Sequence, residues 1–468
     1  MNTWTVDLAV IGAGPAGLMG ALQGAQVGKK VVLIDRLGRL GGASLHQSTI
    51  PSKTLRRAIL DLTGFAPLAE GGKARQGVSL PALMSRVSAV LDEEHAVLHQ
   101  QCVASGIAVI AGTARFLESH RLEVRDGHGA VCGQVWAQDT LIATGSRPRH
   151  PIDLPPDRTR FMDSDQIFRM EPLPGRLIVL GGGIIGCEYA TMFAALGLQV
   201  ILMDRRREVL RMVDAEIRHR CQQAMQAMGV ELQLGQPIHA LRTSEDGQAE
   251  VLRTDGQRVQ ADRLFYALGR LANVEGLNLA AAGIELDPLG HIRVNALFQT
   301  SCPHIYAAGD VIGPPSLAST SMEQGRLAVR NALLLKSHHF PACFPYGIYT
   351  IPEISSVGPT EEELQQQGIH YAVGRAEYRE VARGAIAGDR TGLVKLLFHA
   401  ETLEVLAVHL IGTQATELIG LGQMALTCRV RVDYFIETIF NYPTFAEGFR
   451  IAALNGLRQL GRVRQSTG

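Results

Sequence analysis

A duplicated glycine-rich pattern constrains the fold of this chain more than any other feature of its sequence. In each copy an apolar stretch runs directly into G-x-G-x-x-G, and a helical segment and a second apolar stretch that ends in an aspartate follow. The offset between the two copies is 169 residues, both for the first glycine and for the aspartate. The residues that define the copies are Gly12, Gly14, Gly17 and Asp35, then Gly181, Gly183, Gly186 and Asp204.

Strand, G-x-G-x-x-G, helix, strand and acidic residue is the order that a Rossmann nucleotide-binding unit requires. The glycines let the backbone approach a pyrophosphate at the helix N-terminus, and the aspartate accepts hydrogen bonds from ribose hydroxyls. One copy alone could be a glycine-rich turn in another kind of α/β protein, but duplication at a constant offset is far more specific. The sequence therefore predicts two bound dinucleotides, one for each copy.

Composition indicates an ordinary globular protein. The 468 residues correspond to about three domains, and 46% of them are apolar. The formal net charge is zero, so no global field favours nucleic acid or an anionic membrane as a partner. Seven scattered cysteines without metal-finger spacing predict no metal site, and we interpret them as small core residues in a reducing compartment. Since no apolar stretch approaches membrane-spanning length, the expected location is the cytoplasm.

The segment 41–53, GGASLHQSTIPSK, has the layout of the active-site segment of flavin disulfide reductases. It carries paired glycines, two positions five residues apart, and then Ile-Pro-Ser-Lys. In that family the two positions are cysteines, whereas here they are Ser44 and Thr49. Neither residue can form a disulfide or a thiolate nucleophile, so disulfide reduction is nearly excluded.

The resemblance extends over essentially the whole chain. Beyond the two glycine patterns, it rests on the segments 50–53, 186–189 (Gly-Cys-Glu-Tyr), 308–310 (Ala-Gly-Asp) and 442–444 (Tyr-Pro-Thr). The chain resembles the two-dinucleotide flavoproteins of the dihydrolipoamide dehydrogenase and glutathione reductase group. Within that group, the segments 374–376, 440–444 and 450–457 are similar to those of the soluble, Si-specific pyridine nucleotide transhydrogenases, although these keep a cysteine at the position of Ser44.

The resemblance implies an α/β fold with two Rossmann-like domains, for FAD and NAD(P), and a C-terminal α+β dimerisation domain. The expected boundaries are 1–150 and 273–345 for the two parts of the FAD domain, 151–272 for the NAD(P) domain and 346–468 for the dimerisation domain. Local patterns add a helix with an apolar face over 83–98, strands at 371–378, 393–398 and 405–411, and a capping box at Thr360 and Glu363.

The implied reaction is hydride transfer from NADPH to the flavin and then to NAD⁺, in a homodimer. Lys53 and Glu188 are expected to pair beside the flavin N5, where a cation favours the anionic reduced ring; the alternative is a structural ion pair. Tyr442 replaces the acid/base histidine of the reductases. The resemblance implies that Tyr442 and Glu447 complete the active site of the partner subunit, and the alternative for Tyr442 is a buried tyrosine in a Tyr-Pro turn.

Nucleotide discrimination is expected at the end of the second unit. Asp204 suits the free 2′-hydroxyl of NAD, and Arg205, Arg206 and Arg207 could pair with the 2′-phosphate of NADP, although an arginine run is more often a solvated surface. Asp310 is expected to bind the ribityl chain, the alternative being an acidic turn residue. The predicted cofactor-binding residues are Gly12, Gly14, Gly17, Asp35, Gly42, Ser44, Lys53, Thr144, Gly145, Gly181, Gly183, Gly186, Asp204, Arg205, Arg206, Gly269 and Asp310.

Two alternative functions use the same fold. An accessible reduced flavin could pass electrons to quinones or oxygen, which would make the protein an NAD(P)H diaphorase. The chain could also be a redox-silent flavoprotein that serves as a binding or regulatory module. Retention of Lys53, Glu188 and both glycine patterns argues against the second alternative, because a scaffold would not need them together.

Overall fold

The computed structural model describes residues 2–63, 80–151, 154–336 and 339–466. These residues divide into two compact units. The first comprises Met1–Leu55, Met84–Arg149 and Gly269–Pro341, and the second comprises Arg56–Leu83, His150–Leu268 and Ala342–Gly468. Within the described ranges, no helix combines the length and the apolar character needed to cross a membrane.

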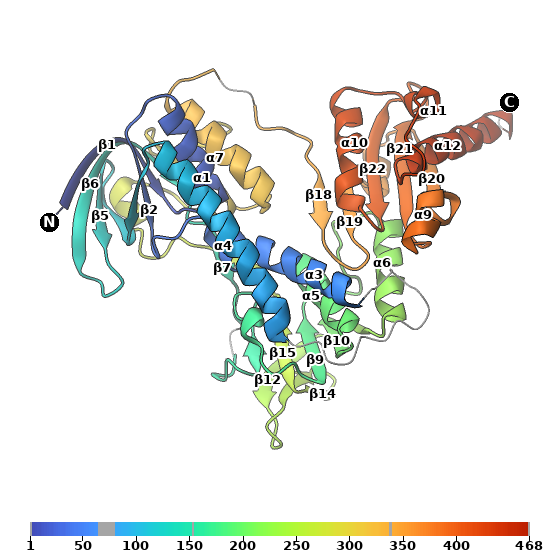
Figure 1. The fold of residues 1–468 in the computed structure, drawn as a ribbon, viewed down its shortest axis with the longest axis horizontal. Coiled ribbons are helices and arrows are strands. Elements are labelled where there is room, and N and C mark those ends of the chain that lie inside the picture. Colours follow the sequence, from blue (N-terminus) through green and yellow to red (C-terminus); the bar gives the residue numbers. More distant parts are fainter. Residues whose placement is uncertain (1, 64–79, 152–153, 337–338, 467–468) are drawn as a thin grey trace. The chain divides into compact units, whose positions relative to one another are not determined.

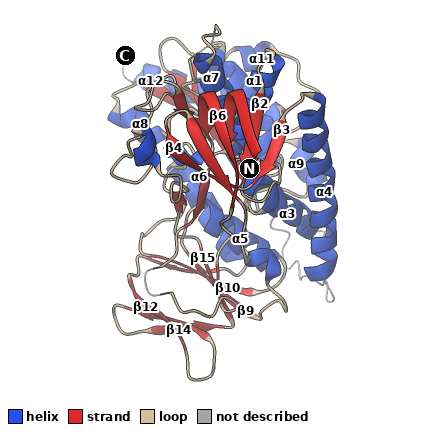
Figure 2. Cartoon of the chain, turned by 90° about the vertical axis from the view of Figure 1, so that its left-hand side faces the viewer, coloured by secondary structure: helices blue, strands red, loops and turns tan. Residues whose placement is uncertain are grey.

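The first unit is built on a seven-stranded sheet with the order β3-β2-β1-β6-β5-β4, in which β17 pairs with β6 (Figure 2). Strands β1, β2, β3, β6 and β17 are parallel, whereas β4 and β5 form an antiparallel extension of β6. The strands are β1 (Asn2–Ile11), β2 (Val31–Asp35), β3 (Ala108–Ala111), β4 (Thr113–Glu118), β5 (Arg121–Arg125), β6 (Val131–Ile142) and β17 (Ile305–Ala307).

Helices α1 (Pro15–Gln26) and α7 (Ala318–Ala332) lie side by side in this unit (Figure 1). Their contact requires a glycine, because a Cβ at Gly325 would lie 1.9 Å from the carbonyl oxygen of Ala16. The remaining helices of the N-terminal region are α2 (Gly42–His46), α3 (Thr49–Thr63) and α4 (Leu80–Ala104). A two-stranded ribbon joins β7 (Ser146–Pro148) to β16 (Arg270–Ala272) within the same unit.

The second unit contains a parallel sheet with the order β11-β10-β9-β15-β8. Helix α5 (Ile184–Ala195) follows β9, and α6 (Ala215–Ala227) follows β10. An antiparallel three-stranded sheet, β12-β13-β14, is inserted before β15. The strands are β8 (Phe161–Met162), β9 (Arg176–Leu180), β10 (Gln199–Asp204), β11 (Glu231–Leu234), β12 (Ile238–Thr243), β13 (Ala249–Arg253), β14 (Arg258–Ala261) and β15 (Arg263–Tyr266).

The C-terminal part of the second unit is an antiparallel sheet with the order β18-β19-β22-β21-β20. Gly374 on β20 permits close packing of α12, because a Cβ there would lie 2.1 Å from the carbonyl oxygen of Ala452. The elements are β18 (Tyr346–Ile348), β19 (Ile354–Val357), α8 (Glu361–Gln366), β20 (Tyr371–Glu377), α9 (Ala382–Ala387), β21 (Leu393–His399), β22 (Val405–Ile411), α10 (Ala415–Thr427), α11 (Tyr434–Glu437) and α12 (Glu447–Ser466).

The expected α/β class and the strands of both glycine-rich units are confirmed. The capping box is confirmed as well, because both of its hydrogen bonds between Thr360 and Glu363 are present. The short antiparallel additions β4–β5 and β12–β14 were not expected, because the expected strands of the two units were continuous apolar runs. Strand β5 (Arg-Leu-Glu-Val-Arg) instead alternates polar and apolar residues, and its burial alternates with them. The interpretation of the cysteines as core residues is only partly right. Cys102, Cys187 and Cys221 are buried, whereas Cys428 is exposed, and all seven cysteines are free.

Candidate functional site

The first glycine-rich turn forms an open cradle at the N-terminus of α1. Gly12 has φ +103°, and a Cβ there would lie 2.3 Å from the carbonyl oxygen of Ala143. A Cβ at Gly17 would lie 1.8 Å from the carbonyl oxygen of Gly12. At Gly14, by contrast, a Cβ would meet nothing within 4 Å. The outer two glycines thus serve internal packing, and the middle one leaves space where a pyrophosphate can approach the helix N-terminus.

The segment 41–53 begins directly against this cradle. Gly42 has φ +55°, and a Cβ there would lie 2.7 Å from Cα of Gly14. Ser44 follows on α2 and is half-buried, and Thr49 is the first residue of α3. Lys53 is half-buried one turn further along α3. The segment is therefore placed against the first cradle, with hydroxyl side chains where the reductases have two thiols.

Asp35 ends β2 and receives its hydrogen bonds from the backbone. The N–H of Ala13 donates to Oδ2 at 3.2 Å, and the N–H groups of Leu37 and Arg39 donate to Oδ1 at 2.9 and 3.3 Å. The carboxylate thereby fixes the turn after β2 against the cradle. Its acceptor capacity is not filled by these three bonds, since a carboxylate has about four lone-pair positions.

Asp310 belongs to the first unit, and two residues that were not predicted site residues, Ser146 and Arg270, hold it in place. Ser146 Oγ donates to Asp310 Oδ2 at 2.6 Å. Arg270 Nε donates in turn to Ser146 Oγ at 2.7 Å, and its Nη2 donates to the Ser146 carbonyl at 2.8 Å. Both residues directly follow predicted glycines, Gly145 and Gly269, and that position was the only available signal for them.

The predicted turn residues around Asp310 adopt the conformations that glycine allows. Gly145 has φ +67° and Gly269 has φ +98°. Thr144 Oγ1 donates to the carbonyl of Asn273 at 2.7 Å, and Asn273 Nδ2 donates back to the Thr144 carbonyl at 3.0 Å. This reciprocal pair fixes the start of β7 against the end of β16.

The second glycine-rich turn repeats the first cradle. Gly181 has φ +115°, and a Cβ there would lie 2.4 Å from the carbonyl oxygen of Ala267. A Cβ at Gly186 would lie 1.8 Å from the carbonyl oxygen of Gly181, whereas one at Gly183 would meet nothing within 4 Å. The N-terminus of α5 therefore offers the same open space for a pyrophosphate.

Asp204 ends β10, is only 5% exposed, and accepts four hydrogen bonds. Oδ1 accepts from the Arg206 N–H at 2.8 Å and from Arg206 Nε at 2.9 Å, and Oδ2 accepts from the Gly182 N–H at 2.6 Å and from Arg206 Nη2 at 2.7 Å. Burial opposes ionisation, but the hydrogen bonds from Arg206 and Gly182 lower the pKa of Asp204. Arg206 therefore folds back onto the carboxylate, although its side chain stays 44% exposed, and Arg205 and Arg207 are exposed as well.

Glu188 lies on α5 and is only 4% exposed. Its Oε1 accepts a hydrogen bond from the N–H of Tyr349 at 2.8 Å. A cation of the same unit, Arg56, donates to the carbonyl of Thr350 at 3.0 Å and lies 3.7 Å from a carboxylate oxygen of Glu353. Burial lowers the pKa of Arg56, and the negative charges of Glu353 and Glu188 oppose that shift. Lys53 belongs to the first unit, and its pairing with Glu188 stays a prediction.

The C-terminal site residues lie at the start of α12. Tyr442 is 74% exposed, so the alternative of a buried tyrosine in the Tyr-Pro turn is wrong for this chain. Glu447 is the first residue of α12, and its Oε2 is buried without a hydrogen-bond partner among the described residues. Such an unsatisfied acceptor is expected where a further group completes the site.

Two family models match the chain. The model described as pyridine nucleotide-disulphide oxidoreductase covers residues 6–325, and the model of the dimerisation domain of these proteins covers residues 344–453. The first match includes both glycine cradles and Asp310, and the second includes Tyr442 and Glu447.

Curated relatives match over nearly their whole length. The soluble pyridine nucleotide transhydrogenases of Mycobacterium bovis and Colwellia psychrerythraea are each 39% identical to this chain. Each match covers 98% of this chain, with 98% of the Mycobacterium protein and 99% of the Colwellia protein. The corresponding protein of Klebsiella pneumoniae is 37% identical, with 98% of this chain and 99% of the relative covered.

Solved structures agree on the fold. LpdA from Mycobacterium tuberculosis superposes with a TM-score of 0.88 at 28% identity, covering 96% of this chain and 99% of its own. The flavoprotein disulfide reductase RclA from Escherichia coli has a TM-score of 0.87 at 24% identity, with 96% and 99% covered. A duplicated glycine cradle, full-length relatives and both family models lead to one conclusion: the chain belongs to the pyridine nucleotide-disulphide oxidoreductase family.

Proposed function

We propose that this protein catalyses hydride transfer from NADPH to NAD⁺, giving NADP⁺ and NADH, with FAD as its cofactor and as a homodimer. The observation that carries the proposal is a pair of complete dinucleotide cradles in a chain whose segment 41–53 holds Ser44 and Thr49 in place of two cysteines. Bound FAD supplies a ring that accepts a hydride from one nicotinamide and returns it to another. No step of this reaction needs a thiol.

The first unit fits FAD. Gly12, Gly14 and Gly17 leave the α1 N-terminus open for the pyrophosphate, and Asp35 keeps acceptor capacity for a ribose. We assign the remaining contacts of the flavin nucleotide to predicted residues of the same unit. They are Gly42, Ser44, Lys53, Thr144, Gly145 and Asp310, with Asp310 oriented by Ser146.

The second unit fits both nicotinamide dinucleotides in turn. Gly181, Gly183 and Gly186 provide the pyrophosphate cradle at α5. Asp204 already holds four donors, so it accepts from the ribose of NAD⁺ only when Arg206 moves away. NADP binds with Arg206 left on Asp204, because the pair cancels the repulsion of the carboxylate and presents a guanidinium to the 2′-phosphate. Arg205 completes the set within this unit, and Gly269, a residue of the first unit, stays a predicted cofactor-binding residue.

Lys53 and Glu188 are proposed to stabilise charge beside the flavin, Lys53 as the cation and Glu188 as the group that orients it. Glu188 is suited to that task because it is buried and already fixed by the Tyr349 N–H. Tyr442 and Glu447 are proposed to act in the active site of the partner subunit, which agrees with the exposure of Tyr442. Seven free cysteines are consistent with a cytoplasmic location.

The test is an anaerobic assay with purified protein. We expect NADPH to bleach the flavin absorbance, and a thio-analogue of NAD⁺ to be reduced rapidly without added thiol. Bleaching without reduction of the analogue would favour the diaphorase alternative, and absence of bleaching would favour a redox-silent module. NADPH deuterated at C4 separately on the two faces of the nicotinamide then tests the proposed Si-specificity. Only the deuterium on the si face (pro-S) should be lost when NADPH is oxidised, and the re-face label should stay in NADP⁺.

A further inference from the structure

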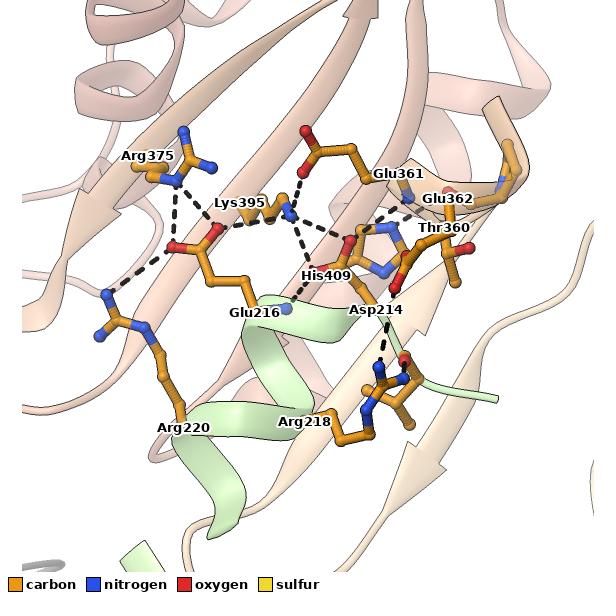
Figure 3. Close-up of polar contacts among 12 residues, drawn as sticks. Asp214, Glu216, Arg218, Arg220, Thr360, Glu361, Glu362, Arg375, Lys395 and His409 are labelled. Atoms are coloured by element: carbon orange, nitrogen blue, oxygen red, sulfur yellow. Dashed lines mark hydrogen bonds and ion pairs between the residues drawn. The ribbon is translucent and has the colours of Figure 1, made fainter. Parts of the chain in front are cut away.

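A buried lysine connects the C-terminal sheet to the start of α6. Lys395 on β21 has a side chain that is 1% exposed, and its Nζ donates to both carboxylate oxygens of Asp214, at 2.8 and 2.9 Å. Glu361 lies 2.6 Å and Glu216 3.3 Å from the same nitrogen (Figure 3). Burial opposes the charged form, but Asp214 and Glu361 together raise the pKa of Lys395 above its usual value.

Asp214 is fixed from three directions. It is fully buried and is the N-cap of α6, accepting from the Glu216 N–H at 3.1 Å. It also accepts from the Glu361 N–H at the start of α8, at 3.3 Å, and from Lys395. A buried ion pair of this kind is weak evidence for stability, because apolar replacements are often as stable, whereas its geometry defines one position for each partner. Asp214 therefore cannot shift without unpairing a buried charge.

Asp214 is the far end of the loop that carries the arginines. We call residues 205–213, which run from Asp204 to Asp214, the arginine loop. Its backbone is fixed on Gly182 of the cradle, since the Leu210 N–H donates to the Gly182 carbonyl at 2.9 Å. Leu210 has φ +47°, a left-handed conformation that is unfavourable for a leucine and persists only when its surroundings impose it.

A second set of contacts braces the same loop from α6. Arg218 Nη1 donates to the carbonyl of Val213 at 2.9 Å, and Arg218 Nη2 lies 3.3 Å from a carboxylate oxygen of Glu208. Arg218 projects from the first turns of α6, whose N-terminus Asp214 caps. Asp214 and its buried partner thus contribute to the position of α6, and with it to that of the arginine loop. The pairs Arg220–Glu377 and Glu216–Arg375 also join α6 to the C-terminal sheet.

We propose that Lys395 is a positioning residue for nucleotide recognition, which acts through Asp214 to hold the arginine loop where Arg206 can serve a 2′-phosphate. The inference rests on the proposed use of NADP. It gives the C-terminal domain a part in selecting the nucleotide, beyond its part in dimerisation, through a contact between residues 181 positions apart in the sequence.

The test measures binding rather than turnover. Calorimetry on the FAD-saturated protein gives the dissociation constants of 2′,5′-ADP and of 5′-AMP, which differ only in the 2′-phosphate. Asp214→Asn keeps a side chain suited to an N-cap and leaves Lys395 its contacts with Glu361 and Glu216. We expect the constant for 2′,5′-ADP to rise about tenfold, and that for 5′-AMP to change by less than about twofold.

Lys395→Met is the second variant, with the same expected result, and Asp214→Asn decides the matter if Lys395→Met does not fold. Arg220→Met is the matched control. It breaks the pair of Arg220 with Glu377, 2.6 Å apart and also between α6 and the C-terminal sheet, without touching Asp214. We expect the ratio of its dissociation constants for 2′,5′-ADP and 5′-AMP to equal that of the wild type.

Three results would contradict the positioning role of Lys395, and they differ in what they imply for the proposed function. An unchanged ratio in Asp214→Asn would overturn the positioning role and leave the proposed function intact. An equal shift in Arg220→Met would also overturn it, because any weakening of the α6 contact would then suffice. If the wild type itself fails to bind 2′,5′-ADP, the proposed use of NADP is wrong, and the role of Lys395 in its recognition is wrong with it.

Discussion

The two glycine cradles of this chain differ in one side chain on an otherwise shared design. In the first, the Ala13 N–H donates to Oδ2 of Asp35, and in the second the Gly182 N–H donates to Oδ2 of Asp204, at 3.2 and 2.6 Å. The middle glycine of each faces open space, and the outer two are closed against backbone carbonyls. The backbone arrangement is thus the same in both units.

The difference lies two residues after each aspartate. Leu37 donates to Asp35 only with its backbone N–H, whereas Arg206 donates to Asp204 with its backbone and with two nitrogens of its guanidinium. The first carboxylate keeps acceptor capacity, and the second is fully occupied. From this difference we propose that the backbone pattern provides for a dinucleotide, and that the side chain two residues after the aspartate selects which dinucleotide binds.

The largest expected effect tests the shared backbone. Gly17→Ala and Gly186→Ala each place a Cβ 1.8 Å from a carbonyl oxygen, so we expect the free energy of unfolding to fall by about 2–3 kcal/mol. Gly14→Ala and Gly183→Ala are the controls, since their Cβ meets nothing within 4 Å. These should keep stability but lose nucleotide affinity. Thermal unfolding measures stability in all four variants. Retained flavin absorbance measures FAD affinity in Gly14→Ala, and calorimetry with NADP⁺ measures nucleotide affinity in Gly183→Ala. Equal destabilisation of the controls would contradict the division between packing and open positions.

The next effect tests the difference itself. Arg206→Leu makes the second unit resemble the first, because it leaves Asp204 with backbone donors only. We expect NADP⁺ to bind about thirtyfold more weakly, corresponding to about 2 kcal/mol for a lost charged contact, and NAD⁺ to bind more tightly. Calorimetry with the oxidised protein measures both constants. A parallel loss for both nucleotides would show that Arg206 holds the loop and does not discriminate.

A smaller expected effect is a difference between the two units in how their stability depends on pH. Burial raises the pKa of Asp139, on β6 of the first unit, to about 6. Its folded pKa lies above its unfolded value, so the folded state binds more protons and stability falls as pH rises from about 4 to 6. Asp204 has the opposite sign, because its lowered pKa makes stability fall as pH drops below about 4.

Asp139→Asn isolates that contribution. Because the amide carries no charge to desolvate, we expect the variant to be about 1 kcal/mol more stable than the wild type at pH 7, a value reduced for partial exposure. The difference should vanish near pH 4. Thermal midpoints of both proteins between pH 4 and 8 give the result. A constant difference across this range would mean that the effect is one of packing, not ionisation.

The smallest effect concerns the exposed arginines beside Arg206. Arg205→Ala and Arg207→Ala should each weaken NADP⁺ binding by less than about threefold. Their exposed charges are screened by solvent, and Arg206 is the arginine whose guanidinium the structure shows oriented on Asp204. The same calorimetric titration with NADP⁺ and NAD⁺ applies. A loss as large as that in Arg206→Leu would shift nucleotide selection from the pair with Asp204 to the charge of the whole arginine run.

Much of the fold followed from local patterns. The strand, glycine turn, helix and aspartate of each unit, and the capping box at Thr360, depend on neighbours within a few turns, so their sequence signals are direct. The role of Ser146 was missed, because its partner Asp310 lies 164 residues away. The pairing of Arg206 with Asp204 was also missed, although the two are only two residues apart in sequence. Whether an arginine binds a ligand or a nearby carboxylate depends on how the loop folds.

The sequence by itself determined that this protein carries two dinucleotide cradles and no dithiol in the segment 41–53. Glycine spacing and residue identity decide those properties, because only glycine fits the backbone conformations and only cysteine supplies the thiol chemistry. The tertiary structure alone decided that Asp204 is occupied by Arg206, and that Lys395 holds Asp214 across 181 residues. The first pair depends on how one loop turns back on itself, and the second forms where segments distant in the chain meet. Burial of each carboxylate then makes its charge depend on the partner that folding brings to it.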